Sequence, residues 1–173
     1  MLDALTTLVD QSLLRRVESA AGEPRFEMLE TIREYALEQL TVAEEDALCR
    51  RRHASWCLAL AEELVPAITG SDQLAALARL DAEHDNLRAA IDWELERGDP
   101  GNALRLAVAL WRFWFIRGHA VEGRAWLERT LAAAPEAPIA LRATASNAVG
   151  ALAHGRGDNA GAVAGFSAAL ELF

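Results

Sequence analysis

The residues best suited to chemistry in this sequence are Cys49, His53 and Cys57, which follow one another at intervals of four. On a helix this spacing brings all three side chains towards one side. Thiolates and imidazoles are ligands that Zn²⁺ prefers, so a metal site is one interpretation. The same stripe continues through Leu60 and Leu64, which favours packing in the core instead. We therefore expect no metal ligands here.

A second candidate is His84, whose neighbours Glu83 and Asp85 could orient it as a general base. It lies on the apolar stripe of a predicted helix, however, which is the ordinary setting of a buried or half-buried histidine. All 17 basic residues are arginine, so the chain has no P-loop lysine and no Schiff-base lysine. We expect no catalytic residues, no cofactor and no enzyme activity, and any ATPase activity would lie outside this segment.

The composition favours a folded, helical chain. Of its 173 residues, 52% are hydrophobic and 25% are charged, which suits one domain, or one domain with part of another. Alanine and leucine dominate, while 5 prolines and 11 glycines interrupt them. The net charge of -9 argues against a protein that binds nucleic acid directly.

The same composition bears on location. No apolar run approaches the ~18 residues that a membrane span needs. The N-terminus carries acidic residues where a signal peptide would carry basic ones. The two cysteines, Cys49 and Cys57, lie too far apart on one helix for a disulfide, which needs Cα atoms within about 7 Å. We therefore expect a cytoplasmic protein.

The first part of the chain carries the signals of a helix and a hairpin. Leucine and valine recur on one side of residues 2–14, which predicts a helix. Residues 25–29 alternate polar and apolar side chains, which predicts a strand. This strand can pair with residues 13–17 across a polar turn at Gly22.

A further helix is predicted next, with Thr31 and Glu34 as a capping box and its end at Leu40. The order of helix, hairpin and helix is that of the last part of a winged-helix unit. Because no complete domain precedes it, we expect the chain to be a piece of a larger protein.

Three arginines, Arg15, Arg16 and Arg25, lie on the predicted wing. In a winged helix that binds DNA, such side chains contact phosphates. We do not expect this wing to contact DNA.

The rest of the sequence predicts helices over residues 44–64, 71–97, 100–117, 119–133, 139–155 and 158–172. Asp99 is the expected N-cap of the third of these helices, Pro100 its first residue and Gly118 its end. This helix is apolar on nearly every side, so it should be the most buried element.

An aromatic cluster is predicted in this region, formed by Trp111, Phe113, Trp114, Phe115 and Trp126. It could line a ligand pocket, although the core of a repeat is the default interpretation. The candidate interaction or pocket residues are Trp111, Trp114, Phe115, Trp126 and Phe166.

Two segments of the chain are similar to each other, with turn glycines Gly118 and Gly157 at matching places. The second segment fits the tetratricopeptide pattern. Gly150 takes the small position of its first helix, and Ala162, Phe166 and Ala169 take the packing positions of its second. The first segment departs more, with Trp111 at the small position and Gly123, Leu127 and Thr130 in the second helix.

The combination LVDQSLL, RFEMLETIREYALEQL, AEHDNLRAAIDWELERGD and LRLAVALWRFWFIRGHAVEGRAWLERTL resembles the region after the NB-ARC ATPase module of bacterial STAND-class regulators. These are ATP-dependent switches, often with LuxR-type or SARP-type DNA-binding domains. The resemblance implies a winged-helix end at residues 1–40 and the start of a helical sensor at residues 41–173. It also implies that sensor and winged helix hold the ATPase closed until an inducer binds.

We therefore predict an all-α fold: a tetratricopeptide-like array of helical hairpins with a small N-terminal β-hairpin. The predicted function is that of a non-catalytic sensor and protein-interaction segment of such a transcriptional regulator. Its expected partners are a protein, a peptide or a small-molecule inducer on the array, and the NB-ARC module of the parent protein. Self-association through exposed apolar ends is a further expectation, and a stand-alone helical scaffold for a peptide or protein partner is the alternative function.

Overall fold

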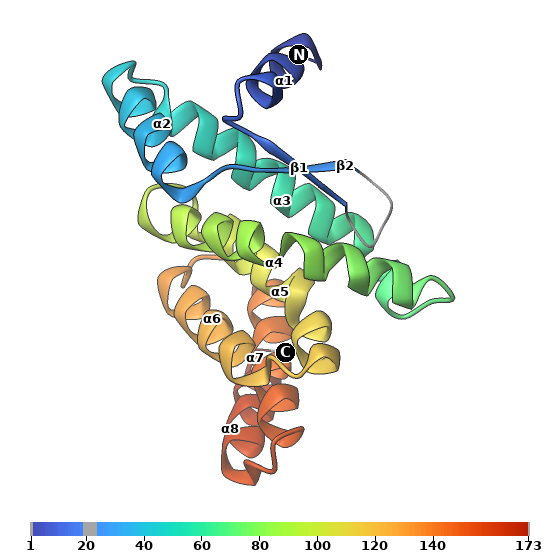
Figure 1. Ribbon diagram of the computed structural model, residues 1–173. Coiled ribbons are helices and arrows are strands. Elements are labelled where there is room, and N and C mark those ends of the chain that lie inside the picture. Colours follow the sequence, from blue (N-terminus) through green and yellow to red (C-terminus); the bar gives the residue numbers. More distant parts are fainter. Residues whose placement is uncertain (1, 19–23, 173) are drawn as a thin grey trace. The chain divides into compact units, whose positions relative to one another are not determined.

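The computed structural model describes residues 2–18 and 24–172. These residues are mostly helical, with a small two-stranded antiparallel sheet near the N-terminus (Figure 1). This confirms the predicted helical class with an N-terminal hairpin. Contacts between residues divide the chain into two compact units, residues 1–51 and residues 52–173.

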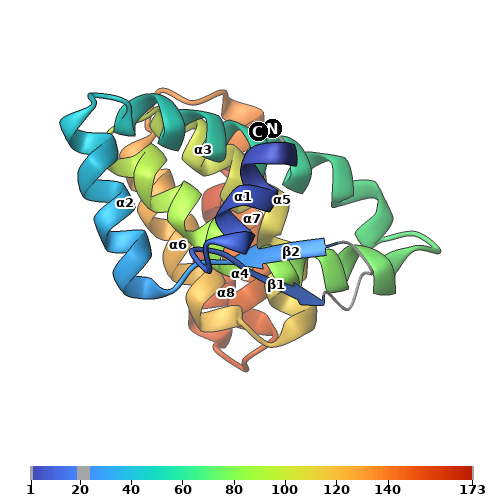
Figure 2. The same cartoon turned by 45° about the horizontal axis from the view of Figure 1, so that its top comes forward.

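The first unit contains a helix, a hairpin and a second helix. Its elements are α1 (Leu2–Asp10), β1 (Arg15–Glu18), β2 (Pro24–Glu27), α2 (Glu30–Val42) and the first turns of α3 (Asp46–Ile68). The two strands lie side by side (Figure 2). The predicted turn residue Gly22 lies outside the described residues.

The end of α1 differs from the sequence prediction. The helix stops at Asp10 instead of residue 14, because Ser12 takes a left-handed conformation with φ of 58°. Helical backbone cannot continue through that conformation. The N–H of Leu13 then donates to the carbonyl oxygen of Leu8 at 2.9 Å, which closes the turn into β1.

The start of α2 also differs, and the capping box predicted at Thr31 and Glu34 is wrong. The helix begins two residues earlier than predicted, at Glu30, and Leu29 stands at the N-cap without a side-chain hydrogen bond. Glu30 instead accepts hydrogen bonds from Arg33, which lower the pKa of its carboxyl group.

The second unit is helical throughout. It contains the rest of α3, then α4 (Gln73–Glu96), α5 (Pro100–Arg117), α6 (Ala120–Ala133), α7 (Ile139–His154) and α8 (Asn159–Leu170). Each helix from α4 onwards packs against the next one in sequence, and α5 also packs against α7. The largest fully buried side chains are Trp114, Phe113, Ile68, Leu77, Leu80, Leu87, Ile91, Leu104, Leu106, Leu110, Leu127 and Leu152. Five of these come from α5, which agrees with its predicted burial.

The predicted boundaries of α5 are confirmed. The carboxylate of Asp99 accepts the N–H of Gly101 at 2.8 Å, and Pro100 is the first residue of the helix. Gly118 ends the helix with φ of 81°, where a side chain would be strained. Gly157 has a similar left-handed conformation in the turn between α7 and α8, with φ of 79°.

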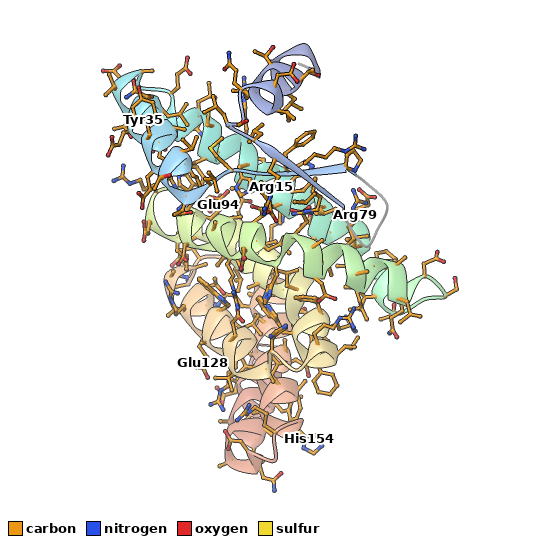
Figure 3. The ribbon with its side chains drawn as sticks, in the orientation of Figure 1. Arg15, Tyr35, Arg79, Glu94, Glu128 and His154 are labelled. Carbon is orange, nitrogen blue, oxygen red and sulfur yellow. The ribbon has the colours of Figure 1, made fainter. Side chains whose placement is uncertain are left out.

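The turn between α4 and α5 depends on a buried acid, Glu94 (Figure 3). Its side chain is 5% exposed and accepts the N–H of Asp99 at 2.7 Å. A Cβ at Gly98 would come within 2.2 Å of Glu94 Oε2. Gly98 is therefore needed for space at this turn.

The hairpin of α7 and α8 is held together at close range by glycines. A Cβ at Gly165 would lie 2.5 Å from the backbone nitrogen of Gly150, and a Cβ at Gly150 would lie 2.7 Å from the ring of Phe166. The predicted small position at Gly150 is therefore a real helix contact. In the α5–α6 hairpin, a Cβ at Gly123 would lie 2.6 Å from the ring of Trp114.

The two cysteines lie in different environments, and neither forms a disulfide. Cys49 is exposed, while Cys57 is buried with its sulfur 3.6 Å from the carbonyl oxygen of Asn86. Burial, followed by the nearby Glu83 carboxylate, raises the pKa of Cys57 to about 12. Within the described residues, no cluster of three or more histidine, cysteine or acidic side chains could hold a metal. No described helix is both long and apolar enough to span a membrane.

We predict that a thiol reagent such as dithionitrobenzoate will modify Cys49 rapidly at neutral pH and will leave Cys57 intact. The reactive form is the thiolate, and Cys57 combines a raised pKa with a buried sulfur. Absorbance should show one fast thiol per native chain, and the second only in denaturant. The variant Cys49→Ser should abolish the fast phase, and two fast thiols in the native chain would contradict the packing described here.

Candidate functional site

The candidate aromatic residues differ in how deeply they are buried: Trp114 and Trp126 belong to the hydrophobic core, and Trp111 packs against that core. Trp114 and Trp126 are buried in the second unit, with exposures of 1% and 9%. Phe115 is 48% exposed beside Gly155. Trp111 and Phe166 instead line two separate surface depressions.

The larger of these depressions is a groove of about 480 Å³ between α3, α5 and α7. We call it the α3–α5–α7 groove, and it belongs wholly to the second unit. Its volume falls within the ~300–1,000 Å³ of ligand pockets. Its lining is mostly apolar and consists of Glu62, Val65, Arg105, Val108, Ala109, Trp111, Arg112, Pro138, Leu141 and Thr144.

Two arginines of α5 give this groove its charge. Arg105 donates three hydrogen bonds to Glu62 of α3, at 2.7 and 3.0 Å to Oε1 and 2.9 Å to Oε2, so these two charges neutralise each other. The guanidinium of Arg112 lies 4.4 Å from the ring centre of Trp111, a cation–π contact. No described carboxylate pairs with Arg112, so the groove keeps one positive charge.

The second depression, of about 380 Å³, lies between α7 and α8 and includes Phe166, Asn147 and Leu170. It shares Thr144 with the α3–α5–α7 groove, so the two are neighbours along α7. Leu170 is 75% exposed, which leaves an apolar surface at this end of the unit.

A polar cluster around Glu122 of α6 joins this helix to α4. Arg88 donates to both carboxylate oxygens, with 2.6 Å from Nη2 to Oε2, and lowers the pKa of Glu122. His84 Nε2 lies 3.4 Å from Glu122 Oε1 without hydrogen-bond geometry. The His84 ring also lies 4.7 Å from that of His119.

The sequence suggested Glu83 and Asp85 as the charged neighbours of His84, but the carboxylate that its ring approaches is that of Glu122. The His84 side chain is 14% exposed, and burial lowers its pKa below the ordinary value of 6.5, opposed in part by the Glu122 carboxylate. Arg88 and Glu122 are 34 residues apart, so no local pattern pointed to this pair.

We predict that the second unit loses stability as the pH falls below 6.5, because His84 is held neutral in the folded state. Between the lowered pKa of His84 in the folded chain and its ordinary value of 6.5, the unfolded chain binds more protons than the folded one. The free energy of unfolding therefore rises with pH in this range. Urea unfolding followed by tryptophan fluorescence at several pH values measures this slope. His84→Gln should flatten it and the exposed control His154→Gln should not; equal slopes in His84→Gln and the wild type would refute the assignment.

The wing arginines do not share one face of the hairpin. Arg15 pairs with Glu27 across the strands and Arg16 with Phe26, so these two side chains point to opposite faces. Arg15 (Figure 3) donates to the Glu27 carboxylate at 2.8 Å. Arg25 is half-buried and opposes Val17.

A depression of about 400 Å³ lies within the first unit, between the end of α1 and the hairpin. Its lining includes Val9, Leu13 and Leu14 beside the backbone and side chains of the wing. The wing therefore combines an internal ion pair with an apolar hollow, which are features of a packing surface.

Comparison with known proteins bears on this first unit. Residues 1–41 match the family described as a winged helix-turn-helix domain. A winged helix-turn-helix domain thus lies at the N-terminus, where the sequence predicts the last part of a winged-helix unit. The boundary between residues 40 and 41 stays a prediction. No solved structure is significantly similar to the chain.

Curated relatives extend the similarity into the second unit. The chain is 42% identical over 132 residues to "Putative HTH-type transcriptional regulator Rv0890c" of Mycobacterium tuberculosis (strain ATCC 25618 / H37Rv). The same values hold for "Putative HTH-type transcriptional regulator Mb0914c" of Mycobacterium bovis (strain ATCC BAA-935 / AF2122/97). The alignment covers 76% of this chain but 14% of each relative. The chain therefore spans about one seventh of the length of these relatives.

Proposed function

We propose that this chain is a non-catalytic regulatory segment of a larger transcriptional regulator. In this proposal the winged helix-turn-helix domain is followed by a helical array that receives a signal from a protein, a peptide or a small molecule. The signal then reaches an ATPase of the STAND class elsewhere in the parent protein.

The observation that carries the proposal is the extent of the similarity to named regulators. An alignment of 132 residues cannot fit within the 41 residues of the winged helix-turn-helix match, so it includes much of the helical unit. Much of the helical unit therefore has a counterpart in proteins named as transcriptional regulators. The low coverage of those proteins supports a segment that acts with other domains.

The geometry supports a receiving role for the second unit. Its successive helices pack against one another and α5 also packs against α7, which supports a tetratricopeptide-like array. The α3–α5–α7 groove offers such an array a ligand surface. The wing supports contact with protein, because its arginines point to different faces and Arg15 is paired with Glu27.

A non-catalytic role predicts that the purified chain binds neither ATP nor duplex DNA. It lacks the lysine and the glycine-rich loop of a nucleotide site, and it carries a net charge of -9. Calorimetry with Mg-ATP and electrophoretic mobility shifts with mixed-sequence DNA test both points. Micromolar affinity for ATP, or a DNA shift lost in Arg16→Gln, would contradict the proposal.

A chimeric regulator tests the proposed function itself. The matching stretch of the Mycobacterium tuberculosis relative would be replaced by this chain, and transcripts would be compared with those of strains that have the native gene or lack it. We expect the chimera to restore the transcript changes that the native gene produces. A stable chimera with the transcript profile of the deletion strain would overturn the proposal.

A further inference from the structure

Most polar side chains that line the α3–α5–α7 groove already make hydrogen bonds within the protein. Thr144 donates its hydroxyl to the carbonyl oxygen of Ala140 at 2.8 Å. Glu62 and Arg105 bind each other, and Arg105 also donates to Asn102 at 3.2 Å. Most polar side chains of the lining are therefore engaged within the protein.

Among the charged side chains of this lining, Arg112 is the exception. Its guanidinium is held over the Trp111 ring, and no described residue accepts a hydrogen bond from it. A guanidinium keeps its charge at every physiological pH and can donate two parallel hydrogen bonds to a carboxylate. The stacking on Trp111 fixes part of the side chain beforehand, which reduces the entropy lost on binding.

These observations define the chemistry of an occupant. The apolar side chains Val65, Val108 and Leu141 favour an apolar body, and Arg112 favours one anionic group. A peptide fits less well, because its main-chain amides would meet few free donors or acceptors in this lining. The volume of about 480 Å³ suits a small molecule.

We infer that the α3–α5–α7 groove binds a small apolar carboxylic acid, with Arg112 pairing with its carboxylate. This ligand site goes beyond the proposed function, because a regulatory segment could respond to a protein partner alone and bind no small molecule. If the chain is such a segment, the site makes an apolar acid the class of signal that it senses.

Matched probes test this site on the full chain. Naphthalene-2-carboxylate and naphthalene-2-carboxamide have the same shape and differ in charge, and equilibrium dialysis measures the binding of each. We expect the carboxylate to bind at least about tenfold more tightly than the amide, the effect of one charge-assisted hydrogen bond. Equal affinities, or no binding of the carboxylate at about 10 mM, would overturn the inference.

Three variants locate the binding. Arg112→Gln should remove the preference for the carboxylate, whereas Arg156→Gln, an exposed arginine outside the groove, should keep it. Val108→Trp should fill the groove and weaken both probes, and circular dichroism would verify the fold of each variant. An equal loss in Arg112→Gln and Arg156→Gln, or undiminished binding to folded Val108→Trp, would contradict the site. Either failure would leave the regulatory proposal standing, because the chimera tests that independently.

Discussion

Replacing Gly165 with valine is expected to lower the free energy of unfolding of the second unit by at least about 3 kcal/mol. A Cβ at this position would lie 2.5 Å from the nitrogen and 2.7 Å from the Cα of Gly150. These neighbours are backbone atoms, so no side chain can rotate away and the two helices must separate. The better helix propensity of valine acts in the opposite direction by only a few tenths of a kcal/mol.

Urea unfolding measures this loss, with tryptophan fluorescence as the signal. All five tryptophans lie within residues 52–173, so the signal reports on the second unit. The matched control is Ala164→Val, an exposed position on the same helix, which should change stability by less than about 0.5 kcal/mol. Equal unfolding midpoints for Gly165→Val and Ala164→Val would show that α7 and α8 do not meet at these glycines.

The second large effect is expected for Trp114→Ala, with a loss of about 3 kcal/mol in the free energy of unfolding. Trp114 is 1% exposed and its ring lies against Gly123. Truncation of a buried tryptophan usually costs ~3–5 kcal/mol through lost contacts and a cavity. We expect the lower end of this range, because the Trp114 Nε1 group has no hydrogen-bond partner among the described residues and its removal relieves that cost.

The neighbouring aromatic residue supplies the control for this second substitution. Phe115 is 48% exposed, so Phe115→Ala should cost less than about 1 kcal/mol. The same unfolding assay compares both variants with the wild type. A larger loss for Phe115→Ala than for Trp114→Ala would mean that the core side of α5 has been assigned wrongly.

Local signals in the sequence predicted the helices of the second unit well. Asp99, Pro100 and Gly118 affect only the backbone within a few residues. The start and end of α5 could therefore be predicted from the sequence alone. The end of α1 and the start of α2 were missed, because a left-handed serine and an N-cap leucine carry no such signal.

Burial along α3 could be predicted only in part. A step of four residues on a helix overshoots a full turn by about 40°, so Cys49 and Cys57 are roughly 80° apart around the axis. Cys57 is buried and Cys49 is exposed. Trp56, which directly precedes the buried Cys57, is 47% exposed. Periodicity therefore identified the helix better than it identified its buried face.

The candidate site shows the same limit. Composition and aromatic spacing pointed to Trp111 and Phe166, which do line surface depressions. The groove also depends on Glu62 and Arg105, which are 43 residues apart and meet only when α3 and α5 pack. Such long-range pairs depend on the fold as a whole, and a single sequence does not reveal them.

Transcript abundance in cells that carry the chimeric regulator tests the regulatory role most directly. The account predicts that the chimera with the native chain restores the regulated transcripts, and that the same chimera with Gly165→Val does not, because the helical unit is disrupted. The exposed substitution Ala164→Val should leave regulation intact. Full regulation by a chimera with an unfolded helical unit, or none by a stable chimera with the native chain, would contradict the role proposed here.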